Sequence, residues 1–213
     1  MELTKHEHAC VVAKKDGTSI VIDPGSFSPA AAEIIAGADV ILLTHEHFDH
    51  VNEGAINAAL ADRPDLRVYA PGALSGMFAA HPGQFTAVAA GTELELGSFG
   101  VTVHGSEHAI IHSSIPGCAN VGFLLDGSVY HPGDAYYVPE VPVTTLLLPT
   151  SGPWMKIGEA IDYVRAVQPR QVVQIHDILL SDIGHQLADM MLGEQGPTGL
   201  PLTAIPAGQS LTI

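Results

Sequence analysis

Cysteine is scarce in this chain of 213 residues, where only Cys10 and Cys118 occur. Two cysteines so far apart do not make the dense disulfide framework of a small secreted protein. They also cannot supply the thiolates of a zinc site built on cysteine. Any metal site must therefore use imidazole and carboxylate ligands. Histidine is correspondingly frequent, with 12 residues.

Basic residues are few as well. The chain has 8 lysines and arginines against 23 acidic residues, which gives a net charge of −15. Such a charge repels a phosphate backbone, and no cluster of basic residues offsets it. We therefore expect no nucleic-acid partner. A small anionic substrate is still compatible with this charge, because bound divalent cations would cancel negative charge locally.

Long apolar runs are absent too. The longest, such as 38–43, are too short to cross a bilayer. The first eight residues lack the apolar core of a signal peptide. These features predict a soluble, cytoplasmic protein with no membrane partner. They leave open whether the chain forms a homo-oligomer.

The composition is that of a globular protein. Hydrophobic residues make up 46% of the chain and charged residues 15%, which excludes a disordered chain. No low-complexity block or Pro/Ser-rich linker divides the sequence. We therefore expect residues 1–213 to form a single domain.

Strands and helices are expected to alternate in the first and last thirds, with a β-rich middle. Turn sequences at Lys15–Thr18 and Asp126–Gly127 predict β-hairpins. The expected strands are 9–13, 19–22, 39–43, 66–70, 93–96, 100–104, 121–125, 129–131, 145–148, 171–175 and 210–213. The expected helices are 29–36, capped by Ser28, then 51–60, 155–167 and 181–192. This pattern favours a four-layer αββα sandwich of the α/β class, although alternation alone would equally fit a doubly wound sheet.

One short segment carries the strongest chemical signal, His45-Glu46-His47-Phe48-Asp49-His50. It follows an expected buried strand and precedes an expected helix, and strand ends are where sites form in α/β folds. In a chain of this composition its four fixed positions would arise by chance roughly 0.002 times. Neutral imidazoles and carboxylates suit zinc, iron or manganese. The segment therefore predicts a metal site.

Three further polar residues follow later expected strands. They are His108, Asp134 in His131-Pro132-Gly133-Asp134, and His176. Each stands at a strand end, where side chains from different strands can converge. A metal ion needs three or more protein ligands, so these residues are candidates to complete the site.

The order of these motifs along the chain resembles that of the metallo-β-lactamase superfamily, and the match covers nearly the whole chain. Within the superfamily, the chain looks more like the branch of ascorbate-6-phosphate lactonase and related hydrolases than like the other members. Three segments carry this likeness: the surroundings of His108, Ile22–Gly25 and Tyr130–Asp134. The resemblance implies the αββα sandwich and two divalent metal ions, with zinc preferred and manganese or iron as alternatives.

The resemblance also implies a set of ligands. It places His45, His47 and His108 on the first metal, and Asp49, His50 and His176 on the second. Asp134 would bridge the two metals. The third ligand of the first metal stays open between His108 and His112, with His104 as a more distant choice. His108 is favoured because it lies nearest to the strand end.

The expected activity is hydrolysis of a small ester, lactone or phosphoester by a metal-activated hydroxide. Asp49 would also orient the nucleophile, and His112 would contact the substrate or protonate the leaving group. A loop histidine without function is an equal interpretation of His112. The alternatives are a redox di-iron protein on the same fold and a metal-binding protein without activity. A nuclease is disfavoured by the charge, and β-lactam hydrolysis by the lack of a secretion signal.

The remaining polar residues are expected to have mainly structural roles. His6 and His8 are expected as ordinary surface on an edge strand, and Asp23 is expected to stabilise the nearby loop and not to bind metal. His131 either orients a ligand or is satisfied by the backbone. Trp154 is expected to serve packing more than to line the pocket.

Overall fold

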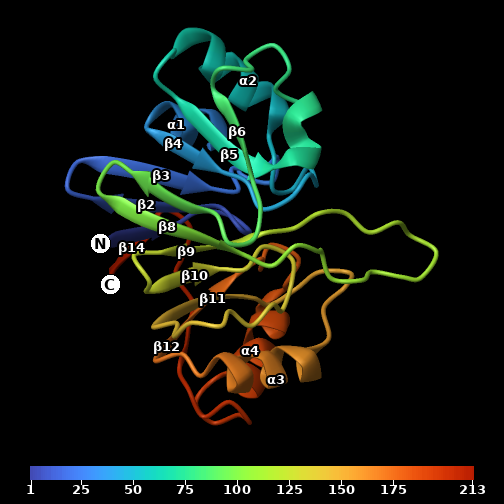
Figure 1. Cartoon of the computed structure of the whole chain (residues 1–213). Coiled ribbons are helices and arrows are strands. Elements are labelled where there is room, and N and C mark those ends of the chain that lie inside the picture. Colours follow the sequence, from blue (N-terminus) through green and yellow to red (C-terminus); the bar gives the residue numbers. More distant parts are fainter.

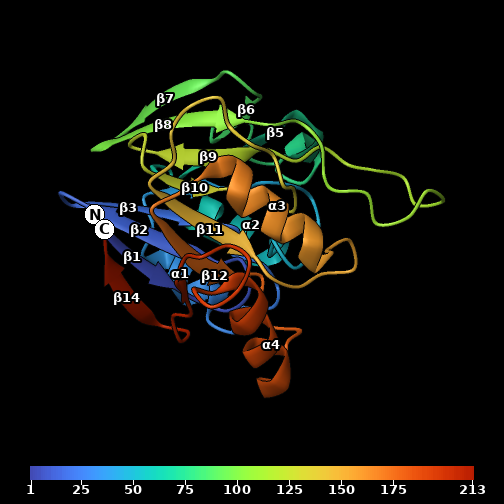
Figure 2. The same ribbon diagram turned by 90° about the horizontal axis from the view of Figure 1, so that it is seen from below.

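The computed structural model describes residues 1–213. Two seven-stranded sheets lie face to face, and a pair of helices covers the outer face of each one (Figures 1 and 2). This arrangement is the αββα sandwich expected from the sequence, and the doubly wound alternative is wrong. No helix is long and apolar enough to span a membrane.

The first sheet has the strand order β14-β1-β2-β3-β4-β5-β6. Its strands are β1 (Glu2–Lys5), β2 (Val11–Lys15), β3 (Thr18–Ile22), β4 (Val40–Leu42), β5 (Arg67–Pro71), β6 (Phe85–Val88) and β14 (Gln209–Thr212). From β3 to β6 the neighbours are parallel, and from β14 to β3 they are antiparallel. The two chain ends therefore lie side by side at one edge (Figure 1).

The second sheet has the order β13-β12-β11-β10-β9-β8-β7 and repeats this half-parallel, half-antiparallel design. Its strands are β7 (Glu93–Leu96), β8 (Phe99–His104), β9 (Gly122–Leu125), β10 (Val129–His131), β11 (Thr145–Pro149), β12 (Gln171–Ile175) and β13 (Leu202–Thr203). β11 is buried along its whole length, which matches its continuous apolar sequence. β8 alternates between buried and partly buried residues, as expected for a strand with one covered face.

Four α-helices and one 3-10 helix complete the fold. They are α1 (Ala31–Ala36), α2 (Glu53–Asp62), α3 (Ile157–Val167), α4 (Asp182–Leu192) and the 3-10 helix η1 (Gly72–Gly76). α1 and α2 cover the first sheet, while α3 and α4 lie over the second (Figure 1). The Asn52 side chain caps α2 by accepting a hydrogen bond from Ala55 N at 3.1 Å.

Three apolar clusters fill the three spaces between the four layers. Ile22, Leu42 and Phe123 belong to the cluster between the two sheets. Ile56 of α2 packs with the outer face of the first sheet, and Val164 of α3 with that of the second. Burial of apolar side chains in all three spaces holds the layers together.

The tight turns follow the sequence signals. Asp16 and Gly17 both have positive φ between β2 and β3, and so do Asp126 and Gly127 between β9 and β10. Two consecutive positive φ values are the geometry of the type I′ hairpin turn, which Asp-Gly adopts readily. Both predicted hairpins are confirmed.

Other expectations about the elements need correction. α1 begins at Ala31 after Ala30, and no side chain caps it. The Ser28 hydroxyl instead donates to the carbonyl oxygen of Glu7 at 3.4 Å. The short strands β1, β6 and β13 were not expected, because few residues define each one.

The ends of β3, β4, β8, β10 and β12 gather at one edge of the sandwich. The loop Asp23-Pro24-Gly25, which follows β3, lies against the loop that follows β4. Ser26 N donates to the carbonyl oxygen of Phe48 at 2.8 Å, and Asn52 N to that of Pro24 at 3.0 Å. A Cβ atom on Gly25 would overlap the backbone carbonyl of Asp49. Glycine is therefore required where these two loops meet.

We predict that Gly25→Ala lowers the free energy of unfolding by about 1–3 kcal/mol, because the added methyl group forces the two loops apart. The measurement is urea denaturation of both proteins. Gly158→Ala is the matched control, since no atom lies within 4 Å of its Cβ position in the first turn of α3. That change should raise the free energy of unfolding by up to about 1 kcal/mol. Equal stability of Gly25→Ala and the unchanged protein would contradict this packing argument.

Candidate metal centre

The histidine segment lies between β4 and α2, and the network around it orients two of its rings. The Thr44 hydroxyl donates to Asp23 Oδ2 at 2.7 Å, so it can only accept from His45 Nδ1 at 2.9 Å. Asp23 Oδ2 also accepts from His50 Nδ1 at 2.7 Å. Both rings are therefore anchored through Nδ1 and turn Nε2 toward the interior of the cluster. Both Nε2 atoms are buried and have no hydrogen-bond partner.

His108 repeats this pattern from the second sheet. It lies in the loop between β8 and β9, and its Nδ1 donates to the carbonyl oxygen of Ala109 at 2.6 Å. Its Nε2 is again buried and without a hydrogen-bond partner. Buried polar atoms without partners are rare, and three imidazole nitrogens in one place need an explanation. The pattern fits metal ligation, because ligating histidines are usually anchored through their other nitrogen.

The structure brings the candidate ligands into three overlapping groups, within each of which the ligand atoms lie no more than 4.8 Å apart. His45, His47 and His108 form one group. A second group consists of Asp49 together with His8, His50 and His176. The third group joins His45 and His50 to Asp134.

Asp134 lies between the first two groups. Its Oδ1 is 3.2 Å from His50 Nε2, and its Oδ2 is 3.0 Å from His176 Nε2. His108 Nε2 lies 3.5 Å from Oδ2. Trp154 Nε1 donates to the same oxygen at 2.7 Å. The carboxylate therefore contacts residues from both groups and is held in place by an indole.

The charges of the cluster follow from burial and from these contacts. Burial lowers the pKa of His45 well below its usual value, and the neighbouring His50 lowers it further. Burial opposes ionisation of Asp134 as well, but His50 and His176 outweigh it and hold the pKa of that carboxyl well below its usual range. Burial would also lower the pKa of His50, but Asp134 and Asp23 raise it well above 6.5. A neutral His45 and an ionised Asp134 are the protonation states that metal binding requires.

The other candidate histidines lie elsewhere. His112 is exposed, and its Nδ1 lies 2.8 Å from the Ser114 hydroxyl. His104 belongs to β8, and its Nε2 lies 2.9 Å from the Thr102 hydroxyl. Neither joins a group that could hold a metal. His131 is satisfied by the backbone, since its Nε2 contacts the carbonyl oxygen of Ala9 and its Nδ1 accepts from Gly133 N.

Three residues have larger roles in the cluster than their sequence context indicated. The interpretation of His8 as surface is wrong, because only 1% of it is exposed and its Nε2 lies 3.0 Å from Asp49 Oδ2. Asp23 orients His50 in addition to accepting a hydrogen bond from Thr44 N in the neighbouring loop. Trp154 bonds Asp134 directly. The only sequence signal for His8 was its alternation with His6, which is too weak to locate a site.

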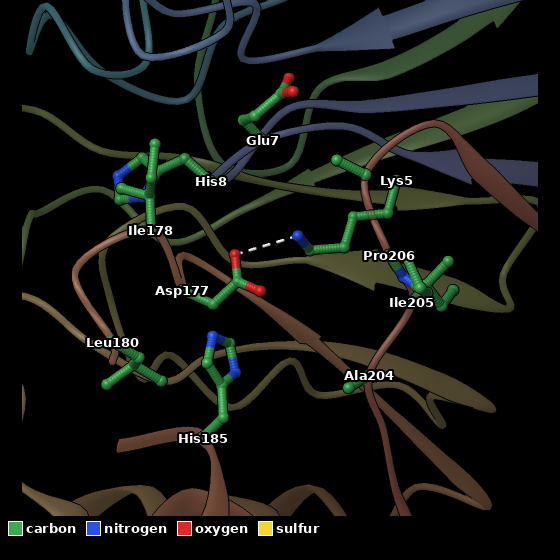
Figure 3. Close-up of a pocket in the computed structure, with 11 residues that line it drawn as sticks. Lys5, Glu7, His8, Asp177, Ile178, Leu180, His185, Ala204, Ile205 and Pro206 are labelled. Carbon is green, nitrogen blue, oxygen red and sulfur yellow. Dashed lines mark hydrogen bonds and ion pairs between the residues drawn. The ribbon is translucent and has the colours of Figure 1, made fainter. Parts of the chain in front are cut away.

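Two pockets lie near the cluster. The smaller, of about 40 Å³, is lined by His47, His108, Cys118 and apolar residues of the loop between β8 and β9. The larger, of about 350 Å³, is lined by His8, Lys5 and other residues (Figure 3). The smaller pocket contacts the first group of candidate ligands directly. The larger one reaches the cluster only at His8.

Comparison with known proteins agrees with the fold and the motifs. The protein Rv0786c of Mycobacterium tuberculosis is 39% identical over 187 residues, which cover 85% of this chain and 86% of the relative. A UPF0173 metal-dependent hydrolase of Lysinibacillus sphaericus is 30% identical over 206 residues, covering 83% and 85%.

Solved structures show the same fold at low sequence identity. The metallo-β-lactamase fold protein YhfI of Bacillus subtilis has a TM-score of 0.71 at 16% identity, covering 99% of this chain and 98% of its own. CmlA, a diiron β-hydroxylase of Streptomyces venezuelae, has a TM-score of 0.75 at 18% identity, covering 100% of this chain and 54% of its own. The model of the β-lactamase superfamily domain matches residues 2–176. This chain therefore belongs to the β-lactamase superfamily and has the metallo-β-lactamase fold.

Proposed function

We propose that the protein is a metal-dependent hydrolase whose residues 1–213 form one catalytic domain with a binuclear centre. The observation that carries the proposal is the set of buried Nε2 atoms on His45, His50 and His108, which have no hydrogen-bond partner and surround Asp134. This donor set fits divalent cations. Zinc is the preferred ion, with manganese and iron as alternatives.

The two groups of ligand atoms divide the proposed binding between two cations. His45, His47 and His108 would hold the first, while Asp49, His50 and His176 would hold the second. Asp134 would bridge them, since its two oxygens face residues of both groups. When bound, the cations lower the pKa of a water molecule and polarise the oxygen of a carbonyl or phosphoryl group.

The protein's own residues would position the reacting groups. Asp49 is the most accessible carboxylate of the cluster, with 17% of its side chain exposed, against 4% for Asp134. Contact with His8 and His50 outweighs the effect of burial and lowers the pKa of Asp49 to about 2. Asp49 is therefore ionised at neutral pH and can accept a hydrogen bond from the attacking water. Trp154 would keep Asp134 in its bridging orientation.

The proposed substrate is a small ester, lactone or phosphoester. The smaller pocket next to His47 and His108 has apolar walls formed by Ile111 and Ile115, among others, and little space. The strongly negative chain has no basic patch that would select a large polyanion. A compact substrate with an electrophilic carbonyl or phosphoryl centre fits the small pocket and needs no basic patch for binding.

A redox reaction at two irons is the alternative on this fold. The same imidazoles and carboxylates suit iron. The two functions differ in their response to oxygen. An optical change that depends on oxygen in the iron-loaded protein, together with no hydrolysis by the zinc-loaded protein, would favour the alternative.

Metal removal gives the first prediction for this proposal. Chelation should abolish hydrolysis of chromogenic esters and phosphodiesters, and added zinc or manganese should restore it, because the proposed hydroxide forms only on bound cations. The measurement pairs substrate turnover with elemental analysis before and after chelation. Turnover that persists in protein with less than about 0.1 metal ion per chain would contradict the proposal.

The second prediction concerns Asp49. Asp49→Asn should lower kcat by about 100-fold or more, because the amide cannot accept a proton from the nucleophile. Glu46→Gln is the matched control, since it removes an exposed carboxylate from the same loop. That control should retain full activity. Full activity of Asp49→Asn with unchanged metal content would show that the role of Asp49 is wrong.

The third prediction concerns His112, which we propose as a contact to the substrate. It lies on the same loop as His108. Its ring is exposed and belongs to none of the three groups of candidate ligands. His112→Gln should lower kcat/KM by about tenfold or more without changing the metal content, because a proton donor for the leaving group is lost. The control is His81→Gln, at the turn before β6. If both variants match the unchanged protein, His112 is an ordinary loop residue.

A further inference from the structure

His8 is a buried histidine that lies outside the family motifs. It follows β1, which lies between β14 and β2 in the first sheet, and its ring packs against rings from three other segments. The ring centroids lie 3.7 Å from His176, 5.6 Å from His50 and 5.2 Å from Phe27. His8 thus touches two proposed ligands of the second cation and shields them from one side.

The hydrogen bond of His8 is directed at a third proposed ligand. Its Nε2 lies 3.0 Å from Asp49 Oδ2. A carboxylate can only accept, so His8 carries its proton on Nε2 and donates it. Its Nδ1 is buried and has no partner. This is the reverse of His45, His50 and His108, which are anchored through Nδ1 and present a bare Nε2.

The backbone around His8 is fastened to the segment that carries His176. Both histidines have left-handed backbone, with φ of 61° and 53°, and His176 N donates to the carbonyl oxygen of His8 at 2.9 Å. Lys5 Nζ, at the end of β1, pairs with Asp177 Oδ1 at 2.9 Å, and both side chains are largely buried.

Figure 3 shows this ion pair in the middle of the larger pocket, with His8 at the edge of that pocket. Left-handed backbone in residues other than glycine costs free energy and persists only where its surroundings enforce it. The end of β1 is therefore held in place against the end of β12.

We propose that His8 is a positioning residue of the second cation site, which orients the Asp49 carboxylate by a hydrogen bond from Nε2. The inference rests on the proposed binuclear function. The four donor atoms of His8, Asp49, His50 and His176 lie close enough to share one ion. Ligation by His8 Nε2 would, however, replace its hydrogen bond to Asp49 Oδ2 and remove the contact that orients this carboxylate.

Two substitutions separate the hydrogen bond from the bulk of the ring. His8→Gln places an amide N–H close to the position of Nε2 and keeps a donor for Asp49. His8→Asn tolerates the left-handed backbone but is too short to reach the carboxylate. His6→Gln is the matched control, because His6 is two residues earlier and contacts none of the proposed ligands. Circular dichroism of each apo variant reports whether it folds.

The measurement is a stepwise titration of each metal-free protein with zinc against a chromophoric chelator. The unchanged protein, His6→Gln and His8→Gln should bind two equivalents tightly. His8→Asn should keep the first equivalent and bind the second about 10–100-fold more weakly. Unchanged binding of both equivalents by His8→Asn would overturn the proposal. Equal weakening in His8→Gln and His8→Asn would also overturn it, because the imidazole itself would then be required.

A second measurement reads the tautomer of His8 directly in the unchanged protein. Nitrogen-15 histidine spectra of the zinc-loaded, unchanged protein should show His8 as the Nε2–H tautomer, with neither ring nitrogen bound to zinc. The resonance is assigned by its loss in His8→Gln. An Nδ1–H tautomer or a zinc-bound nitrogen would overturn the inference. Failure of the proposed function is distinct, because the unchanged protein would then not bind two equivalents of zinc.

Discussion

The buried carboxylate of Asp23 accepts three hydrogen bonds, from Thr44 N, the Thr44 hydroxyl and His50 Nδ1. Through the Thr44 hydroxyl it also determines the proton position on His45. Two imidazoles are thereby held with their Nε2 atoms toward Asp134. Without this carboxylate, neither ring would have a defined tautomer or orientation, and the cluster would lose the preorganisation that a metal site needs.

Both sheets contribute residues to the candidate centre, and the first sheet contributes more of them. His8, Asp23 and the loop 45–50 follow strands of the first sheet, whereas His108, Asp134 and His176 follow strands of the second. The apolar cluster between the sheets fixes the distance between these halves. Burial of so many titratable groups is costly unless they are paired or bind metal. Burying the titratable groups of this site costs free energy, and the stability of the rest of the sandwich offsets that cost.

Part of this arrangement could be predicted from the sequence. The residues from His45 to His50 predicted a metal site because they lie on one short loop, where neighbours in sequence are neighbours in space. Asp134 and His176 were recognisable because they follow apolar strands. The sandwich needed the family resemblance, since alternation of strands and helices also fits a doubly wound sheet. His8 was misjudged, because its burial depends on contact between the ends of β1 and β12, which no local pattern encodes.

The central claim is that this cluster binds two cations. Anomalous diffraction from crystals of the zinc-loaded protein, collected on both sides of the zinc absorption edge, tests it most directly. The account predicts two anomalous peaks beside Asp134, one facing His45, His47 and His108, the other facing Asp49, His50 and His176. A zinc-loaded crystal with one peak or none among these residues would contradict it.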